Sequence, residues 1–378
     1  MYSVSGHAAM IYDTRRLEAY QRALQVAVTP DSVVVDIGTG LGIFAFLACQ
    51  AGARKVYAIE PCEVIAVARE MAATNGYLDR IEFIQDISTR VALSERADVI
   101  VSDLGGAIPL FQQHLPSIVD ARKRLLKPHG VLIPKCDTLW AGVVNAAAVH
   151  AKIVPASDRA LGLDMRLAWN ISSNNSTNKR FTEAQLVTAP QPLAVLDYSE
   201  IEDPDLDTQV KWDVIRSGDG HGIILWFDRT LADGVCFSTA PGEPEMVYGG
   251  LFLPWPEPVE LNEGDSVLLN IRADLRGEEY IWSWNTRISR AAQVKHTFRQ
   301  SSFFGEPHSP ARLRKQSTTH VPRLNEDGEI NRFILQLMNG ENAIEDIARE
   351  VLQQFPARFP TLDGAIAHTA KLSRDYSI

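Results

Sequence analysis

The feature that most constrains this sequence is an apolar strand that runs directly into a glycine-rich turn. Val33–Val35 are β-branched, Asp36 precedes the turn, and Gly38, Gly40 and Gly42 alternate with other residues before an apolar helix starts. Glycine permits positive φ and lets a ligand approach the main chain closely. The pattern is therefore typical of α/β domains that bind a nucleoside or dinucleotide, although by itself it is shared by several such folds.

The first region predicted from the apolar runs is residues 1–135. Strand-like runs alternate there with helical stretches, which is typical of βαβ units and a parallel sheet. The expected strands are 33–35, 56–59, 81–84, 98–101 and 131–134, and the expected helices start near 43, 63 and 116. Residues 127–130, Lys-Pro-His-Gly, read as a helix stop and a turn.

Two further regions follow. Residues 136–300 hold short runs rich in valine, isoleucine, tryptophan and phenylalanine between turn residues, which predicts an antiparallel β-barrel or sandwich. Residues 301–378 are helical, with apolar residues at helical spacing in 327–339, 343–355 and 361–376. The expected fold class is α/β: a Rossmann-like domain, then a β-barrel or sandwich, then a small helical, winged-helix-like module.

Bulk properties narrow the function classes. The formal net charge of -10 argues against bulk nucleic-acid affinity, and no apolar run approaches the length needed to cross a bilayer. The cysteines are scattered and form no CxxC pair, so neither a metal site nor a disulfide framework is expected, and a reducing cytoplasm is the expected location. These cysteines are Cys49, Cys62, Cys136 and Cys236.

Acidic residues at three strand ends narrow the ligand. Asp36 directly precedes the turn, an arrangement common in methyltransferases. Glu60 ends the second strand, where a carboxylate accepts from both ribose hydroxyls. Asp86 follows the third strand, where its side chain accepts from an adenine amino group while the Ile87 amide faces the ring. An enzyme that binds NAD has less need of the third acid, so S-adenosylmethionine is the predicted cofactor.

With these residues in place, the first 300 residues resemble the protein arginine methyltransferases. Residues 10–20 resemble the segment that precedes the family's fold, and 222–228 and 237–241 resemble its barrel segments. In that segment an arginine, matched by Arg16, pairs with the methionine carboxylate of the cofactor. The predicted cofactor residues are Arg16, Asp36, Gly38, Thr39, Gly40, Glu60, Pro61, Asp86, Ile87 and Asp103.

The sequence departs from that family at the substrate loop. The family carries two glutamates that cage the guanidinium; Asp103 falls on the first and the uncharged Gln112 on the second. Because a guanidinium is permanently charged and is best held by two carboxylates, either the acceptor is not arginine or it is held differently, with Asp103 or Glu245 alone. The family's threonine-histidine-tryptophan loop is replaced by Glu245-Met246-Val247. Asp103 and Gln112 are the predicted catalytic residues, and His114 and His221 are alternative bases to Asp103.

The last region resembles the small PqqD-like domains that bind leader peptides in pathways of ribosomally synthesised, modified peptides. The similarity lies in Leu324-Asn325, a helix ending at Gly340, and a helix that opens with Ile344 and Ile347-Ala348. Such domains hold an extended peptide with a strand edge and a helix. An ordinary helical extension that packs on the barrel or forms a dimer contact explains the same residues.

Three hypotheses follow. The first is a methyltransferase acting on a peptide or protein side chain, including a ribosomally synthesised peptide, recruited by the last region. The second is a small-molecule N-methyltransferase acting on free arginine or a natural-product intermediate. The third is an inactive protein that binds S-adenosylmethionine or a peptide. The resemblance implies a homodimer formed through an arm inserted in the barrel, but no counterpart of that arm is evident, so dimerisation stays open.

Overall fold

A five-stranded parallel sheet carries the glycine-rich turn at the carboxyl end of its central strand. The computed structural model describes residues 9–155, 157–291 and 293–377. Its contacts divide the chain into two units, residues 1–307 and 308–378. The sheet belongs to the first unit and has the order β3-β2-β1-β4-β5. Its strands are β1 (Val33–Ile37), β2 (Lys55–Ile59), β3 (Ile81–Ile84), β4 (Ala97–Ser102) and β5 (Leu126–Ile133).

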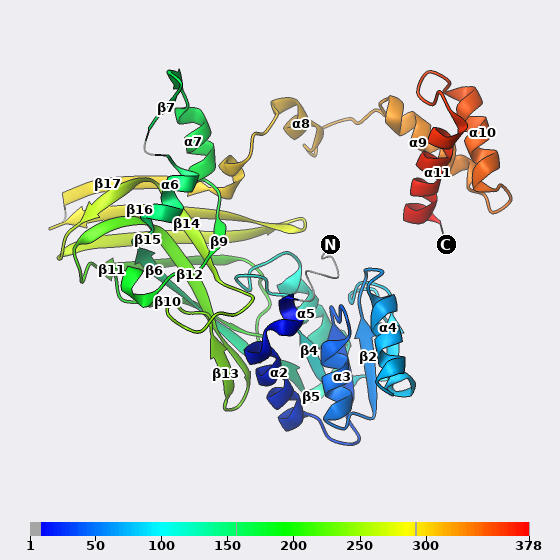
Figure 1. Cartoon of the computed structure of the whole chain (residues 1–378), viewed down its shortest axis with the longest axis horizontal. Coiled ribbons are helices and arrows are strands. Elements are labelled where there is room, and N and C mark those ends of the chain that lie inside the picture. Colours follow the sequence, from blue (N-terminus) through cyan, green and yellow to red (C-terminus); the bar gives the residue numbers. More distant parts are fainter. Residues whose placement is uncertain (1–8, 156, 292, 378) are drawn as a thin grey trace. The chain divides into compact units, whose positions relative to one another are not determined.

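Helices cover this sheet because its central strands β1, β2 and β4 are largely buried and need apolar cover (Figure 1). The helices are α2 (Thr14–Ala27), α3 (Ile43–Gln50), α4 (Ile65–Thr74) and α5 (His114–Arg124), with a 3₁₀ turn η1 (Leu78–Arg80). The predicted Rossmann-like arrangement is confirmed, with all of its predicted strands present. One detail is wrong: residues 127–130 lie inside β5. Pairing with β4 shifts between Ala97 and Val99, and His129 has a φ of 65°, so the Pro-Gly turn is absorbed as an irregularity of the strand.

The rest of the first unit is mainly antiparallel. One sheet has the order β10-β6-β12-β14-β9, with β13 paired to β12, and a second has the order β11-β15-β16-β17. Trp212, Trp255 and Trp284 are fully buried between them, which gives a sandwich-like core. The strands are β6 (Cys136–Val144), β9 (Thr177–Lys179), β10 (Gln191–Asp197), β11 (Leu206–Asp213), β12 (Gly218–Ala232), β13 (Val235–Ser238), β14 (Gly250–Leu261), β15 (Asp265–Arg276), β16 (Glu279–Arg290) and β17 (Gln293–Ser301), followed by η3 (Ser302–Gly305).

The strand β12 is paired on both sides where it approaches the α/β sheet. Arg229 lies opposite Asp137 of β6 and opposite Phe237 of β13. The backbone of this segment is therefore held by two ladders at once, and side chains that leave it toward the α/β sheet have a fixed origin.

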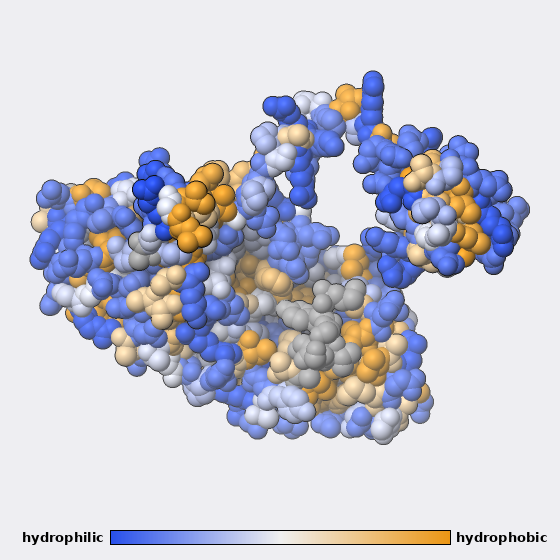
Figure 2. Space-filling view, turned by 45° about the horizontal axis from the view of Figure 1, so that its top comes forward, coloured by the Kyte–Doolittle hydropathy of each residue, from blue (hydrophilic) through white to orange (hydrophobic). Residues whose placement is uncertain are grey.

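A helical insertion interrupts the β region between β6 and β9, where the sequence predicted short strands between turn residues and a polar loop at 172–177. It consists of α6 (Ala147–Ile153), the two-stranded β7 (Arg159–Ala160) and β8 (Leu163–Asp164), and α7 (Arg166–Ser173); η2 (Glu183–Gln185) follows β9. The insertion projects from the sheets (Figure 1), and apolar residues gather on it at the surface (Figure 2). Leu161, Leu163 and Leu167 are at least 66% exposed. The β region therefore carries a projecting helical insertion with an exposed apolar surface.

The second unit forms its own core. It contains α8 (Pro310–Lys315), α9 (Glu326–Leu337), α10 (Ile344–Gln354) and α11 (Leu362–Tyr376). Ile330, Ile334, Ile347, Val351 and Leu372 pack together, so the predicted helical periodicity is confirmed. Asn325 and Thr361 cap α9 and α11 with their side chains. Residues 308–377 as described contain no strand, so the strand edge of a winged-helix-like module has no counterpart there.

None of the helices within the described ranges has the length and apolar character that a membrane crossing requires.

Candidate active site

The predicted cofactor residues meet at one edge of the parallel sheet. Ile37 pairs with Ile59 and with Ser102, and Ile59 pairs with Ile84. Because parallel strands end at the same edge, the residues that follow β1, β2, β3 and β4 form a row there. The structure therefore brings together the glycine turn, Glu60, Asp86 and Asp103, in the crevice position where open α/β sheets bind ligands.

The glycine turn adopts a backbone that other residues resist. Gly38, Gly40 and Gly42 have φ values of 74°, 54° and 86°. A Cβ on Gly38 would lie 2.5 Å from Cδ2 of Leu104 in the loop after β4. Gly38 and Thr39 also donate their amides to the carbonyl of Ile59, at 2.9 and 3.1 Å. The turn is thus pressed against both neighbouring strand ends, which explains why glycine is needed.

Asp36 fastens this turn to the start of α3. Its Oδ2 accepts from Thr39 Oγ1 at 2.5 Å and from the Ala45 amide at 3.0 Å. The residue is fully buried, and its Oδ1 has no hydrogen-bond partner within the described residues. Burial raises the pKa of the Asp36 carboxyl to about 7, against the hydrogen bonds from Thr39 and Ala45, which lower it.

Glu60 links the turns that follow β1 and β2. Its two oxygens accept from the Gly40 amide at 3.1 Å and the Cys62 amide at 3.0 Å, and the residue is 8% exposed. Pro61 beside it is exposed. After β3, Asp86 is half-buried and accepts from the Ile87 amide at 2.7 Å, while the Ile87 side chain is 40% exposed. These carboxylates retain lone pairs for the hydroxyls and amino group of a nucleoside.

Arg16 reaches the same edge from α2. Asp13 caps that helix by accepting from the Arg16 amide at 3.1 Å, and its other oxygen accepts from the Val247 amide at 2.7 Å. The Arg16 guanidinium lies over the rings of Tyr20 and Phe44, with its carbon 5.7 and 5.1 Å from their centroids. Asp13 therefore joins the N-terminal segment to the β-region loop that contains Val247.

Asp103 lies between two arginines. Its Oδ2 accepts from Arg16 Nε at 2.6 Å and from the Tyr248 hydroxyl at 2.7 Å, and its Oδ1 accepts from Arg229 Nη1 at 2.8 Å. Burial acts to raise the pKa of Asp103, but Arg16 and Arg229 outweigh it, so the pKa lies below its ordinary value. The Asp103 side chain is 3% exposed.

Arg229 is in turn paired with Asp137. Arg229 Nε and Nη2 donate to Asp137 Oδ1 and Oδ2, both at 2.8 Å, and both side chains are fully buried. Asp137 Oδ2 also accepts from the Tyr198 hydroxyl. A two-point pair of this kind fixes the plane of the guanidinium as well as its position.

Uncharged polar groups complete this cluster. The Tyr20 hydroxyl lies 3.2 Å from Arg229 Nη1, and His114 Nε2 lies 3.1 Å from the Tyr198 hydroxyl. Burial raises the pKa of Tyr20, Tyr198 and Tyr248, and burial lowers the pKa of His114 to about 4. At neutral pH all of these groups are therefore uncharged.

Gln112 is turned away from this cluster. It has a φ of 43°, and its amide nitrogen donates to Glu279 of β16 at 3.1 Å, where both residues are exposed. Gln113 donates to the Gly277 carbonyl at 2.6 Å. The substrate loop thus rests on the tip of the β15–β16 hairpin, and Asp103 and Gln112 have separate partners.

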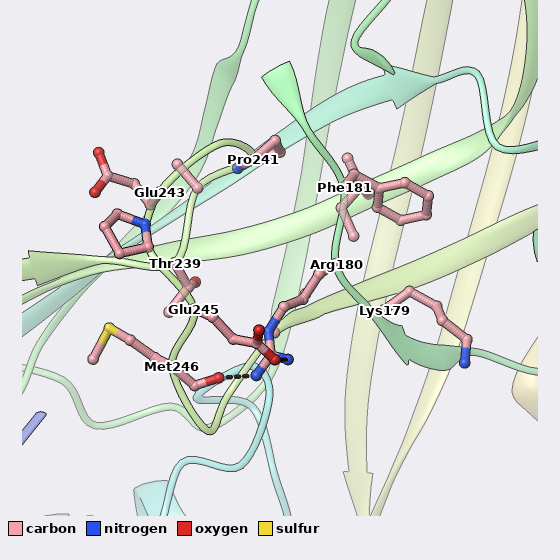
Figure 3. Close-up of a pocket in the computed structure, with 13 residues that line it drawn as sticks. Lys179, Arg180, Phe181, Thr239, Pro241, Glu243, Glu245 and Met246 are labelled. Atoms are coloured by element: carbon pink, nitrogen blue, oxygen red, sulfur yellow. Dashed lines mark hydrogen bonds and ion pairs between the residues drawn. The ribbon is translucent and has the colours of Figure 1, made fainter. Parts of the chain in front are cut away.

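The loop that contains Glu245 lines a separate pocket (Figure 3). Lys179, Arg180 and Phe181 line it from β9 and the segment after it, and Thr239, Glu243 and Met246 line it from the loop after β13. Arg180 pairs with Glu245 and donates to the Met246 carbonyl. Glu245 is therefore engaged by Arg180.

His221 lies in a different part of the molecule. It is eight positions from Arg229 along β12, or about 26 Å at the rise of an extended strand. There it packs edge-on against His150 at 5.4 Å between ring centroids. His114, in contrast, belongs to the cluster around Arg229.

Sequence reasoning missed Arg229, Asp137, Tyr20 and Tyr248. The available signal was an arginine inside the apolar run 223–231, because a buried strand tolerates a charge only with a partner. Among the described residues, no group of His, Cys, Asp or Glu side chains is arranged to hold a metal ion.

The fold and the row of strand-end residues define a methyltransferase that depends on S-adenosylmethionine. Residues 17–135 match the ribosomal protein L11 methyltransferase family. The chain is 38% identical over 301 residues to protein arginine N-methyltransferase PRMT10 of Oryza sativa subsp. japonica, covering 68% of the chain and 77% of that relative. It belongs to the protein arginine N-methyltransferase family.

Two further comparisons give a more distant relative and a solved structure of the same fold. It is 28% identical over 231 residues to a probable protein arginine N-methyltransferase 6 of Arabidopsis thaliana, covering 59% of the chain. The chain spans about half, 53%, of that relative's length. The Trypanosoma brucei PRMT1 enzyme-prozyme heterotetrameric complex with AdoHcy has the same fold, with a TM-score of 0.73 and 23% identity, covering 78% of this chain and 97% of that one.

Proposed function

We propose that this protein transfers a methyl group from S-adenosylmethionine to a side chain of a peptide or protein. The observation that carries the proposal is the row formed by the glycine turn, Glu60, Asp86 and Asp103 at one sheet edge, with Arg16 beside it. When bound, S-adenosylmethionine supplies a methyl group on a positively charged sulfur, so the protein needs mainly to orient the two reactants.

The chain's own residues suit the parts of this cofactor. Glu60 would accept from the ribose hydroxyls and Asp86 from the adenine amino group, with Pro61 and Ile87 beside them. Gly38, Thr39 and Gly40 offer close backbone approach, and Asp36 holds that turn on α3. Arg16 would pair with the methionine carboxylate, next to Asp103. Asp103 and Gln112 are the proposed substrate-side residues.

The second unit is the proposed recruiting part, as in the PqqD-like domains it resembles. Its independent core and the apolar side chains it leaves exposed, among them Leu335 and Ile344 at 38% and 40%, support this role. Since no strand is described in 308–377, an extended leader segment of a peptide substrate would be held by helix faces. The cytoplasm is the proposed location, because the four free cysteines suit a reducing compartment.

A homodimer is the proposed assembly. The exposed leucines of the α6–α7 insertion offer an apolar contact that a second copy would cover. The T. brucei complex named above is itself an oligomer, which supports assembly as a property of related chains.

The experiment is calorimetric titration of the full chain with S-adenosylhomocysteine and, in parallel, with NADH. Saturable binding of the first ligand alone is expected. A radiolabelled methyl-transfer assay over peptides with and without a leader segment then tests the acceptor. A folded sample that binds neither ligand would disprove the proposed function.

A further inference from the structure

We infer that Arg229 occupies, from within the chain, the place of a substrate guanidinium on the substrate-loop carboxylate, so that the site selects an acceptor without positive charge. The inference rests on the proposed methyl transfer and names the substrate class of the same site. Four observations carry it. Asp137 and Asp103 both bind Arg229, and Asp103 has few acceptor positions left. The buried charges are balanced, and Gln112 is hydrogen-bonded outside the cluster.

Arg229 is held as a bound guanidinium would be. Asp137 grips it at two points, 2.8 Å each, and Asp103 accepts from its remaining nitrogen at 2.8 Å. Its guanidinium carbon lies 4.9 Å from the centroid of the Phe227 ring and 5.7 Å from that of Tyr248. Two carboxylates with aromatic faces are the partners that recognise a guanidinium, and here the fold supplies both partners and ligand.

Asp103 has little capacity left for a second cation. A carboxylate offers about four acceptor positions, and three are taken by Arg16, Tyr248 and Arg229. A substrate guanidinium would have to displace Arg229, which is fully buried and clamped by Asp137. The first carboxylate of the substrate loop is therefore already satisfied.

The buried cluster carries no net charge. The carboxylates of Asp103 and Asp137 are balanced by the guanidiniums of Arg16 and Arg229. The tyrosines around them and His114 are uncharged at neutral pH, as described above. The cofactor would add a carboxylate beside Arg16 but also a sulfonium and an ammonium, so its own net charge is positive. A cationic acceptor would therefore find no unpaired negative charge here.

Gln112 does not restore the missing charge. Its amide is committed to Glu279, and both residues are exposed, so the Glu279 carboxylate is solvated at the hairpin tip. Gln112, at the position where the related family carries its second glutamate, therefore adds no charge to the buried cluster.

An acceptor that suits this site carries a free lone pair at neutral pH, as a carboxylate oxygen or a neutral imidazole nitrogen does. Its lone pair forms the bond to the methyl carbon while the carbon–sulfur bond breaks and sulfur keeps that electron pair. A carboxylate becomes a neutral ester with no proton to remove; an imidazole becomes an imidazolium that releases its N–H proton to water. Asp103, held by two arginines, need not act as a base.

The test compares acceptors on the full chain. Blocked Gly-X-Gly peptides with X as Arg, His or Glu compete for labelled S-adenosylmethionine. Wild type should label the His or Glu peptide roughly tenfold or more over the Arg peptide. The variant Arg229→Met with Asp137→Leu removes the internal guanidinium together with its own carboxylate and should shift the preference toward Arg. A surface pair, Arg54→Met with Glu95→Leu, is the matched control and should leave the preference unchanged.

A binding measurement on wild type tests the inference even if the tripeptides are methylated slowly or the double variant is unstable. Acetylarginine amide should bind wild type loaded with S-adenosylhomocysteine more weakly than acetylhistidine amide does. Preferred labelling of the Arg peptide by wild type, or tighter binding of the arginine amide to it, would overturn the inference and leave methyl transfer intact. Loss of S-adenosylhomocysteine binding would instead count against the proposed function.

Discussion

Arg229 and Asp137 form a two-point ion pair, with Nε–Oδ1 and Nη2–Oδ2 both at 2.8 Å and neither side chain exposed. The pair lies where β12 and β6 meet the α/β sheet, and it connects through Asp103 to Arg16 on α2. A buried pair gives little net stability compared with apolar residues of the same volume, but breaking it leaves a charge without a partner.

Removing Arg229 alone should therefore destabilise the chain strongly. Arg229→Met leaves Asp137 and part of Asp103 uncompensated, and we expect a loss of about 3–5 kcal/mol in the free energy of unfolding. Arg229→Met with Asp137→Leu should lose less than half of that. Urea denaturation of wild type, both single variants and the double variant measures the coupling; additive losses would show that the two residues do not act as a pair.

Glu60→Ala should weaken binding of S-adenosylhomocysteine by roughly 10- to 100-fold, because charge-assisted hydrogen bonds to the ribose are lost. Glu60→Gln keeps the shape and part of the hydrogen bonding, so its loss should be smaller. Calorimetric titration gives both affinities. Glu60 also accepts from two backbone amides, so a modest fall in melting temperature is expected; a collapsed thermal transition would mark it as mainly structural.

Asp36 should make stability depend on pH. Burial raises its pKa from the ordinary 3.8 to about 7, so the folded chain retains a proton that the unfolded chain has released. The resulting stability is complete below about pH 4 and is lost as the pH rises toward 7. Asp36→Asn removes this loss, so the variant should gain on wild type by the order of 1–3 kcal/mol between pH 5 and pH 8 in urea denaturation. A constant difference across that range would refute the assignment.

Ile334→Ala should damage the second unit alone. Ile334 is fully buried in the core shared by α9, α10 and α11, and truncation of such a side chain costs about 2–5 kcal/mol. Gln336, two positions further along α9, is exposed, so Gln336→Ala is a matched control with a small effect. S-adenosylhomocysteine affinity should be unchanged in both, while methylation of a leader-bearing peptide should fall only in Ile334→Ala. Equal methylation by both variants would exclude recruitment by this unit.

Leu167→Glu should weaken self-association. Leu167 is 76% exposed on the α6–α7 insertion, and a charge there opposes burial in an apolar contact. Val26→Glu, at a residue 67% exposed near the end of α2, is the control. Light scattering over a dilution series gives the mass of each. Wild type that is monomeric throughout would exclude the dimer.

The cofactor edge was predictable because its signals are local in sequence. Val33–Ile37, the glycine turn and Glu60 lie within 28 residues and follow from strand periodicity and strand-end chemistry. The pair Arg229–Asp137 was not, because its members are 92 positions apart and the sequence offers each a nearer charge, Asp228 beside Arg229 and Lys135 two positions before Asp137. The α6–α7 insertion was missed because its helices are only eight residues or fewer.

The double ladder around Arg229 bears on how adaptable this enzyme is. A selectivity residue on a loop swings aside when a ligand binds elsewhere, so its preference is open to regulation. Arg229 stands on a strand paired with β6 on one side and β13 on the other. Moving Arg229 would require breaking backbone hydrogen bonds on both sides of β12. The acceptor preference is therefore expected to change only through substitution of these residues, and not through binding of a regulatory ligand.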